Sequence, residues 1–271
     1  MKKLFSNKGL LLCGVGKMGG ALLTGWHTEG LDLEKISVVE PNPSKWLISL
    51  KDLGLKLNEH ITVEPEVCVI AVKPQMVERL LSQLSFSRTQ NTLFVSIAAG
   101  IKIKKLNDLL GNRSAIIRAM PNTPVSIKKG VSCLIQNNNT SDEQMKLVET
   151  LFSVVGKTIW LNNENDMDAV TAISGSGPAY VFYLIEAMAA AGIDLGLDPK
   201  LAYRLAVLTV SGAGSLAETA KVPVNVLREN VTSPNGTTEA ALNVLMEPNQ
   251  GLSQIMQKAI FAASNRSKNL S

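Results

Sequence analysis

The chain lacks the residue patterns on which several common kinds of chemistry depend. It has two histidines, His27 and His60, and three cysteines, and none of them stands in a metal-ligand or triad spacing. Neither Cys-x-x-Cys nor Gly-x-Ser-x-Gly occurs. The sequence therefore gives no support to a metalloenzyme or a hydrolase, and no bound metal is expected.

Secretion signals and disulfides are missing as well. Cys13, Cys68 and Cys133 are odd in number, far apart and embedded in apolar stretches, which is typical of reduced, buried thiols in a cytoplasmic protein. The first residues combine lysines with a short apolar run, but the run breaks into glycines without a small-residue cleavage site. We therefore expect no secretory signal.

Strong charge and long apolar spans are also lacking. Lys and Arg number 27 against 23 Asp and Glu, with no run of five like charges, so nucleic acid is not an expected partner. The most apolar stretch, residues 169–197, contains Gly-Ser-Gly-Pro, Glu186 and Asp194. A buried or interfacial helix fits this stretch better than a membrane span, so no membrane association is expected.

The first half of the chain alternates short apolar runs with helical periodicity. The runs at 67–72 and 93–97 are continuous and do not alternate, as in strands covered on both faces, so we expect a parallel α/β sheet. Ser141, with Gln144 three residues later, predicts a capped helix start. The expected strands are 10–13, 36–39, 67–72, 93–97, 114–118 and 131–135, and the expected helices are 21–27, 75–84, 103–110 and 141–155.

The second half predicts helices alone from residue 179 onward. They are expected at 179–191, 200–219, 224–230, 238–246 and 252–267, with Asp198 and Pro199 as a start signal. The first two are apolar nearly all round, so we expect them to be buried in the domain or between subunits, in a homodimer built on this half. The polar stretch 161–166 predicts a boundary between domains 1–162 and 163–271.

Three glycines carry the clearest motif. Gly14, Gly16 and Gly19 form G-x-G-x-x-G directly after an expected strand and before a helix, where backbone can approach a pyrophosphate. Glu40 follows the next strand, where a carboxylate accepts hydrogen bonds from an adenosine ribose and repels a 2′-phosphate. This argues for NADH, but Lys45 could compensate, so the cofactor choice stays open. Glu40 as a solvated loop residue is the alternative.

Other short segments stand where ligands bind in such folds. Residues 71–74 and 97–100 end two strands, and residues 120–124, with two prolines, predict a rigid loop that could shape the nicotinamide end. Residues 174–179 and 233–238 lead into helices, whose free N–H groups suit a carboxylate. From the local sequence alone, residues 71–74 are equally typical of an ordinary strand-to-helix turn. Each of the last two segments is, taken alone, also typical of an ordinary capped turn.

Taken in order, GVGKMGG, AVKP, SIAAG, RAMPNTP, TAISGSGPAYVF and VTSPNGTT resemble the motif series of the pyrroline-5-carboxylate reductase family, over residues 10–247. The resemblance implies a Rossmann-type doubly wound domain, followed by an all-α dimerisation domain. It implies an active site between the cofactor domain and helical segments of two subunits, in a homodimer or a higher oligomer of dimers. The implied reaction is reduction of 1-pyrroline-5-carboxylate to L-proline with NADPH or NADH, the last step of proline biosynthesis.

The resemblance also assigns site residues. Thr238 and Glu164 would be catalytic, and the substrate would be bound by Ser176, Gly177, Pro178, Thr237 and Thr238. The cofactor would be bound by Gly14, Val15, Gly16, Lys17, Met18, Gly19, Glu40, Asn42, Asn58, Ala71, Val72, Lys73, Pro74, Ala98, Ala99 and Gly100. Asn235 departs from the family, which usually has glycine there, but Asn tolerates positive φ.

Three functions are weighed against one another. In a reductase, Thr237 and backbone N–H groups would bind the carboxylate, Thr238 the ring nitrogen, and Glu164 the cationic iminium or that hydroxyl. A 3-hydroxyacid dehydrogenase would need a lysine base on the first long helix of the second domain, but residues 180–195 contain none. A non-catalytic dinucleotide sensor need not keep an intact substrate turn.

Overall fold

The computed structural model describes residues 4–5, 8–86 and 90–269. The chain divides into two compact units. Unit 1 comprises Met1–Gly175 and Ser264–Ser271, and unit 2 comprises Ser176–Ala263. Each unit is built around its own secondary structure, and each is described by itself below.

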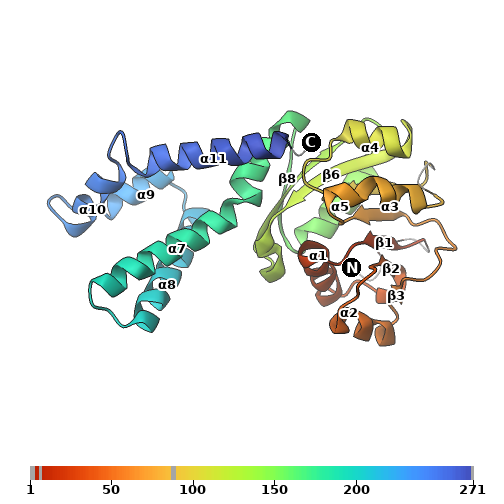
Figure 1. The fold of residues 1–271 in the computed structure, drawn as a ribbon, viewed down its shortest axis with the longest axis horizontal. Helices are drawn as coiled ribbons and strands as arrows, with labels where there is room; N and C mark the ends of the chain where they lie inside the picture. The colour runs from red at the N-terminus through yellow and green to blue at the C-terminus, as the bar shows by residue number, and fades with distance from the viewer. Residues whose placement is uncertain (1–3, 6–7, 87–89, 270–271) are drawn as a thin grey trace. The chain divides into compact units, whose positions relative to one another are not determined.

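Unit 1 contains an eight-stranded sheet in the order β3-β2-β1-β4-β5-β6-β7-β8 (Figure 1). All neighbouring pairs are parallel except β6 and β7. The strand order reverses between β1 and β4, and dinucleotides bind at such a switch point in doubly wound folds. The strands are β1 Leu10–Cys13, β2 Ile36–Val39, β3 Lys56–Leu57, β4 Val67–Ile70, β5 Leu93–Ser96, β6 Ala115–Pro121, β7 Gly130–Gln136 and β8 Gly156–Trp160.

Helices cover both faces of this sheet. Alternate residues of each strand point to opposite faces, so one strand contributes to two separate cores. Leu10 and Leu12 of β1 belong to a core shared with α1 (Lys17–Thr28), α2 (Lys45–Ser49) and α5 (Asp142–Ser153). Leu11 and Cys13 belong to a second core, shared with α3 (Val77–Gln83) and α4 (Ile103–Leu110). The expected three-layer α/β domain is confirmed.

The three cysteines are free and buried, as expected from the sequence. Cys68 on β4 shares a hydrogen bond with Cys13 on β1, and this contact together with burial raises the pKa of the Cys68 thiol. Burial likewise raises the pKa of Cys133 on β7.

Every strand expected from the sequence is present to within a few residues, but two described strands and two described α-helices were not expected: β3, β8, α2 and α6 (Met167–Val170). β3 has two residues and α2 has five, too short for a periodic signal, while β8 is an edge strand with alternate exposed residues. The expectation of a parallel sheet is corrected at β6 and β7, which pair antiparallel. The short 3-10 helix Thr123–Ile127 joins them directly, whereas a parallel pair needs a long crossover.

Unit 2 consists of helices alone among its described residues, as expected. They are α7 Gly177–Asp194, α8 Pro199–Thr219, α9 Val224–Asn230, α10 Thr237–Leu245 and the first part of α11, Leu252–Lys268. Asp198 caps α8 by accepting from the backbone N–H groups of Lys200 and Leu201. No described helix of the chain is both long and apolar enough to cross a membrane.

The apolar helices of unit 2 are not covered by the unit itself. α7 and α8 pack side by side (Figure 1), and the buried apolar side chains of the unit are the alanines Ala189, Ala202 and Ala206. Large side chains on these helices remain exposed, among them Phe182, Tyr183, Tyr203 and Leu208. Of the two expected environments, the interior of unit 2 is therefore wrong for these faces, and burial between subunits stays a prediction.

Residues 164–175 belong to unit 1, which contains the sheet. They form the 3-10 helix Glu164–Asp166, α6 Met167–Val170 and the π-helix Thr171–Gly175. The Ser267 hydroxyl near the end of α11 donates to Asp168 Oδ1 at 2.7 Å in a buried contact. The first segment of unit 1 ends at Gly175, whereas the domain boundary between residues 162 and 163 stays a prediction from the sequence.

Candidate functional site

The glycine loop between β1 and α1 lies at the carboxyl edge of the sheet. Gly14 has φ +94°, and a Cβ on it would come within 2.7 Å of the Ala71 carbonyl oxygen. A Cβ on Gly19 would overlap the Gly14 carbonyl oxygen, whereas Gly16 has open space around it. Gly16 is the N-cap of α1 and no side chain caps this helix start. The open, uncapped N–H groups fit a pyrophosphate.

Glu40 follows β2 and reaches back to this loop. Its Oε2 accepts from the Val15 backbone N–H at 2.8 Å, and its Oε1 accepts from the Asn42 N–H at 3.0 Å. Asn58, after β3, has φ +55°, in the left-handed region.

The Asn58 side chain holds the backbone of Glu40. Its Oδ1 accepts from the Glu40 N–H and its Nδ2 donates to the Glu40 carbonyl oxygen, each at 2.8 Å. The Asn58 backbone N–H in turn donates to the Val38 carbonyl oxygen of β2 at 2.8 Å. The predicted residues Glu40, Asn42 and Asn58 are thus brought together with Val15 in one hydrogen-bonded group.

The ends of β4 and β5 complete the same edge. Ala71, after β4, donates its N–H to the Cys13 carbonyl oxygen at 2.8 Å, and Ile97, after β5, donates to the Ile70 carbonyl oxygen at 3.0 Å. The predicted residues 71–74 and 98–100 therefore lie beside the glycine loop in strand order β1, β4, β5. Lys73 is exposed and precedes the short 3-10 helix Pro74–Met76.

An apolar pocket opens beside Glu40, between the end of β2 and α3. Val39, Pro41 and Asn42 come from the end of β2 and the loop after it, and the other lining residues come from the segment after β4 and from α3. Its lining residues are Val39, Pro41, Asn42, Val72, Met76, Arg79, Leu80 and Gln83. An apolar pocket next to the Glu40 carboxylate has the chemistry that a planar base requires.

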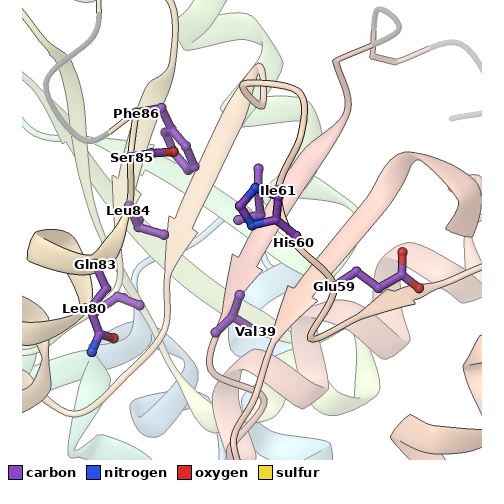
Figure 2. Close-up of a pocket in the computed structure, with 9 residues that line it drawn as sticks. All are labelled: Val39, Glu59, His60, Ile61, Leu80, Gln83, Leu84, Ser85 and Phe86. Carbon is purple, nitrogen blue, oxygen red and sulfur yellow. The ribbon is translucent and has the colours of Figure 1, made fainter.

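A second pocket shares Val39, Leu80 and Gln83 with the first and continues along α3. Figure 2 shows His60 and Ile61 on one side facing Leu80, Leu84 and Phe86 on the other. The Glu59 carboxylate points away from the other lining side chains in this view.

Glu164 lies at the same sheet edge and forms an ion pair. Its Oε1 accepts from Arg118 Nη1 at 2.9 Å and from the backbone N–H of Ile103, the first residue of α4, at 2.8 Å. The Arg118 side chain is 4% exposed and that of Glu164 is 25% exposed. Glu164 therefore fixes the start of α4 to β6, and Oε2 takes no hydrogen bond from the described residues.

Two of the sequence motifs meet inside unit 1. Asn122 Nδ2 donates to the Ser174 carbonyl oxygen at 3.2 Å, while its Oδ1 accepts from the Val131 N–H at 2.9 Å. A Cβ on Gly175 would lie 2.6 Å from Met120 Cε. The proline-rich loop after β6 and the π-helical turn are therefore in direct contact.

The predicted substrate residues lie in unit 2, at two helix starts that no side chain caps. Ser176 is the N-cap of α7, with Pro178 in its first turn, and Gly236 is the N-cap of α10, which begins at Thr237. Asn235 adopts the positive φ that its substitution for glycine requires, and its N–H donates to Glu239 Oε2 at 2.7 Å. The turn before Thr237 and Thr238 thus survives the departure from the family pattern.

The sequence predicted the residues that lie together at the carboxyl ends of β1 to β5, called the nucleotide edge below, but it did not predict two contacts. Arg118, the partner of Glu164, and Asn122, which joins two motifs, were not singled out. A signal for Arg118 exists, because a lone arginine inside an otherwise apolar strand needs a buried partner. Asn122 is one of several polar residues in its loop, and the sequence around it does not indicate that it contacts Ser174.

The doubly wound sheet, the glycine loop at its switch point and Glu40 at the end of β2 define a nicotinamide-dependent oxidoreductase. A family model described as NADP oxidoreductase, coenzyme F420-dependent, matches residues 9–100. A second, described as pyrroline-5-carboxylate reductase dimerisation, matches residues 164–270. The chain is 37% identical to pyrroline-5-carboxylate reductase of Haemophilus influenzae over 267 residues, covering 97% of this chain and 98% of that one. The chain belongs to the pyrroline-5-carboxylate reductase family.

Solved structures agree with this assignment. A pyrroline-5-carboxylate reductase of Coxiella burnetii has a TM-score of 0.87 at 35% identity, covering 98% of this chain and 99% of that one. The Plasmodium falciparum pyrroline carboxylate reductase with NADP bound has a TM-score of 0.86 at 29% identity, covering 97% and 98%. The expected fold, enzyme class and use of NADPH or NADH are thereby confirmed, and the helical half is a dimerisation domain.

Proposed function

We propose that this protein reduces 1-pyrroline-5-carboxylate to L-proline with NADPH or NADH, as the last step of proline biosynthesis in the cytoplasm. The observation that carries the proposal is the assembled nucleotide edge of unit 1, in a chain aligned with pyrroline-5-carboxylate reductases over nearly its whole length. The cofactor-binding residues proposed are those predicted from the sequence at the ends of β1 to β5. A bound reduced nicotinamide supplies the hydride.

Unit 2 supplies the proposed substrate residues. The uncapped N–H groups at the start of α10, with the Thr237 hydroxyl, bind the substrate carboxylate. The Thr238 hydroxyl binds the ring nitrogen, and residues 176–178 at the start of α7 complete the substrate site. A protonated cyclic imine is already electrophilic, so the main task of these residues is to hold its carbon in line with the hydride donor.

The proposed part of Glu164 is electrostatic and positional. Its ion pair with Arg118 offsets part of its charge, which weakens any stabilisation of a cationic iminium. The bond to the Ile103 N–H places Glu164 next to residues 98–100, where the nicotinamide end of the cofactor is proposed to lie. Glu164 is therefore proposed to hold this end of the sheet in shape and to contribute its unbonded Oε2 to the site.

The oligomer proposed is a homodimer, or a higher assembly of dimers, formed through α7 and α8. The support is the exposure of large apolar side chains on these helices, which a second copy would cover. A 3-hydroxyacid dehydrogenase is disfavoured because α7 contains no lysine that could act as its base.

The first test measures oxidation of NADH and NADPH with 1-pyrroline-5-carboxylate, together with formation of proline. Turnover that yields proline is the expected result. Cofactor binding without turnover would contradict the proposal and favour a dinucleotide sensor.

A second test addresses Thr238. Thr238→Ala is expected to lower kcat by about a hundredfold, because the hydroxyl assists proton transfer at the ring nitrogen, while Thr238→Ser retains most activity. Thr219→Ala is the matched control, since the Thr219 hydroxyl bonds only to helix carbonyls of α8. Full activity of Thr238→Ala would remove Thr238 from the mechanism.

A further inference from the structure

We infer that Glu40 makes this enzyme select NADH over NADPH, because its carboxylate is fixed where the adenosine 2′-position binds. This inference rests on the proposed function and adds to it the choice of cofactor. The bound NADP of the Plasmodium falciparum relative does not decide the choice, because that protein is 29% identical and this chain's own residues line the ribose site.

The backbone of Glu40 is immobilised first. Two hydrogen bonds from the Asn58 side chain hold its N–H and carbonyl groups, each at 2.8 Å. Asn58 can do so because its left-handed backbone, φ +55°, turns the side chain back towards β2. These bonds do not involve the Glu40 side chain, so they remain when that side chain is replaced.

The carboxylate is then fixed by two backbone donors. Oε2 accepts from Val15 inside the glycine loop, and Oε1 accepts from Asn42. A carboxylate has about four acceptor positions, so about two remain for further donors. Ribose 2′- and 3′-hydroxyl groups are donors and fit these positions, as at the acidic residue of NAD-binding folds.

A 2′-phosphate has the opposite chemistry. It carries a charge of about −1.5 to −2 near neutral pH and offers acceptors where Glu40 needs donors. Among the described residues no Lys or Arg forms an ion pair with Glu40 that could offset this repulsion. The two hydrogen bonds from backbone also prevent the carboxylate from swinging aside without leaving two N–H groups unpaired.

Two nearby cations could reverse the preference. Lys45 begins α2, five residues after Glu40, and forms no ion pair among the described residues. Arg79 of α3 lines the pocket next to Asn42, and a guanidinium can bind a phosphate with two parallel hydrogen bonds. The backbone carbonyl oxygen of Arg79 accepts a hydrogen bond from the Ser82 hydroxyl. Among the described residues, no ion pair joins the Arg79 side chain to Glu40. We therefore assign Arg79 to the adenine pocket, and the experiment includes it.

The experiment compares NADH and NADPH by two measurements, equilibrium binding by calorimetry without substrate and kcat/KM with 1-pyrroline-5-carboxylate. The wild-type protein is expected to prefer NADH by about tenfold or more in both. Glu40→Ser is expected to reduce the preference by about tenfold or more, chiefly through tighter binding of NADPH. Glu40→Gln, which removes the charge at nearly constant size, should move it in the same direction.

Two controls separate the possible causes. Glu59→Gln removes an acid close to the same edge that points away from the pocket, and it should leave the preference unchanged. Arg79→Ala should weaken both cofactors alike. The inference would be overturned if the wild-type protein preferred NADPH. It would also be overturned if Arg79→Ala abolished a wild-type preference for NADH. The binding measurement keeps this outcome distinct from failure of the proposed reaction, which shows as absent turnover with intact binding.

Discussion

Arg118 is a buried cation, and Glu164, the anion that pairs with it, is partly exposed. Glu164→Ala is expected to lower the free energy of unfolding by about 3 kcal/mol, because it leaves Arg118 uncompensated inside β6. Urea unfolding followed by circular dichroism measures this change. The loss also frees the first N–H of α4, so a reduction in cofactor affinity should accompany it.

Asp166 provides a control for that variant. It lies two residues from Glu164, is exposed, and its side chain caps no helix. Asp166→Ala should change the free energy of unfolding by less than about 0.5 kcal/mol. Replacing both partners, as Arg118→Met with Glu164→Met, should recover much of the stability. Equal stability of the Glu164 and Asp166 variants would show that the ion pair contributes nothing.

The thiols give a second prediction for single residues. The pKa values of Cys68 and Cys133 are raised, the former by its contact with Cys13 and by burial and the latter by burial, so little reactive thiolate forms near neutral pH. A thiol reagent should therefore react slowly with the native protein. After unfolding it should react readily with all three cysteines. Rapid reaction of the native protein would mean that β1, β4 or β7 opens readily.

Among the elements, the glycine loop makes the sharpest distinction between stability and binding. Gly16 has free space and an extended backbone, so Gly16→Ala should cost at most about 1 kcal/mol of stability. It should nevertheless weaken cofactor binding by about tenfold or more, because the methyl group occupies the approach of the pyrophosphate. Calorimetry and thermal unfolding measure the two effects separately.

Gly19 is the matched position in the same element. A Cβ there would overlap the Gly14 carbonyl oxygen, so Gly19→Ala should cost about 1–3 kcal/mol of stability as well as cofactor binding. If both variants bound the cofactor like the wild type, the loop would not be the pyrophosphate site.

The elements also show what sequence patterns can and cannot predict. Ser141 and Gln144 form the expected capping box of α5, because both partners lie within one helical turn. The fully buried runs of β1, β4 and β5 were equally clear. The two residues of β3 have no local pattern and exist through pairing with β2. For the site, strand ends and glycines were readable, whereas the Arg118–Glu164 contact joins residues 46 positions apart.

For the whole molecule, unit 2 should depend on a partner subunit. Leu208 of α8 is exposed, and Leu208→Asp is expected to shift the protein towards monomers in analytical ultracentrifugation and to lower its activity. Ile127→Asp is the control, because Ile127 is a similarly exposed apolar residue in unit 1. An unchanged mass for Leu208→Asp would place the subunit interface elsewhere.

The buried contact between Ser267 and Asp168 has a consequence for how the protein is made. Unit 1 begins with the first strand of the sheet, but its last segment, residues 264–271, follows the whole of unit 2 in the chain. On the ribosome, Asp168 must therefore wait for Ser267 until about 100 further residues have been added, at roughly 5–20 residues per second. For these seconds the nascent sheet carries an unfinished surface, which makes it a natural substrate for chaperones.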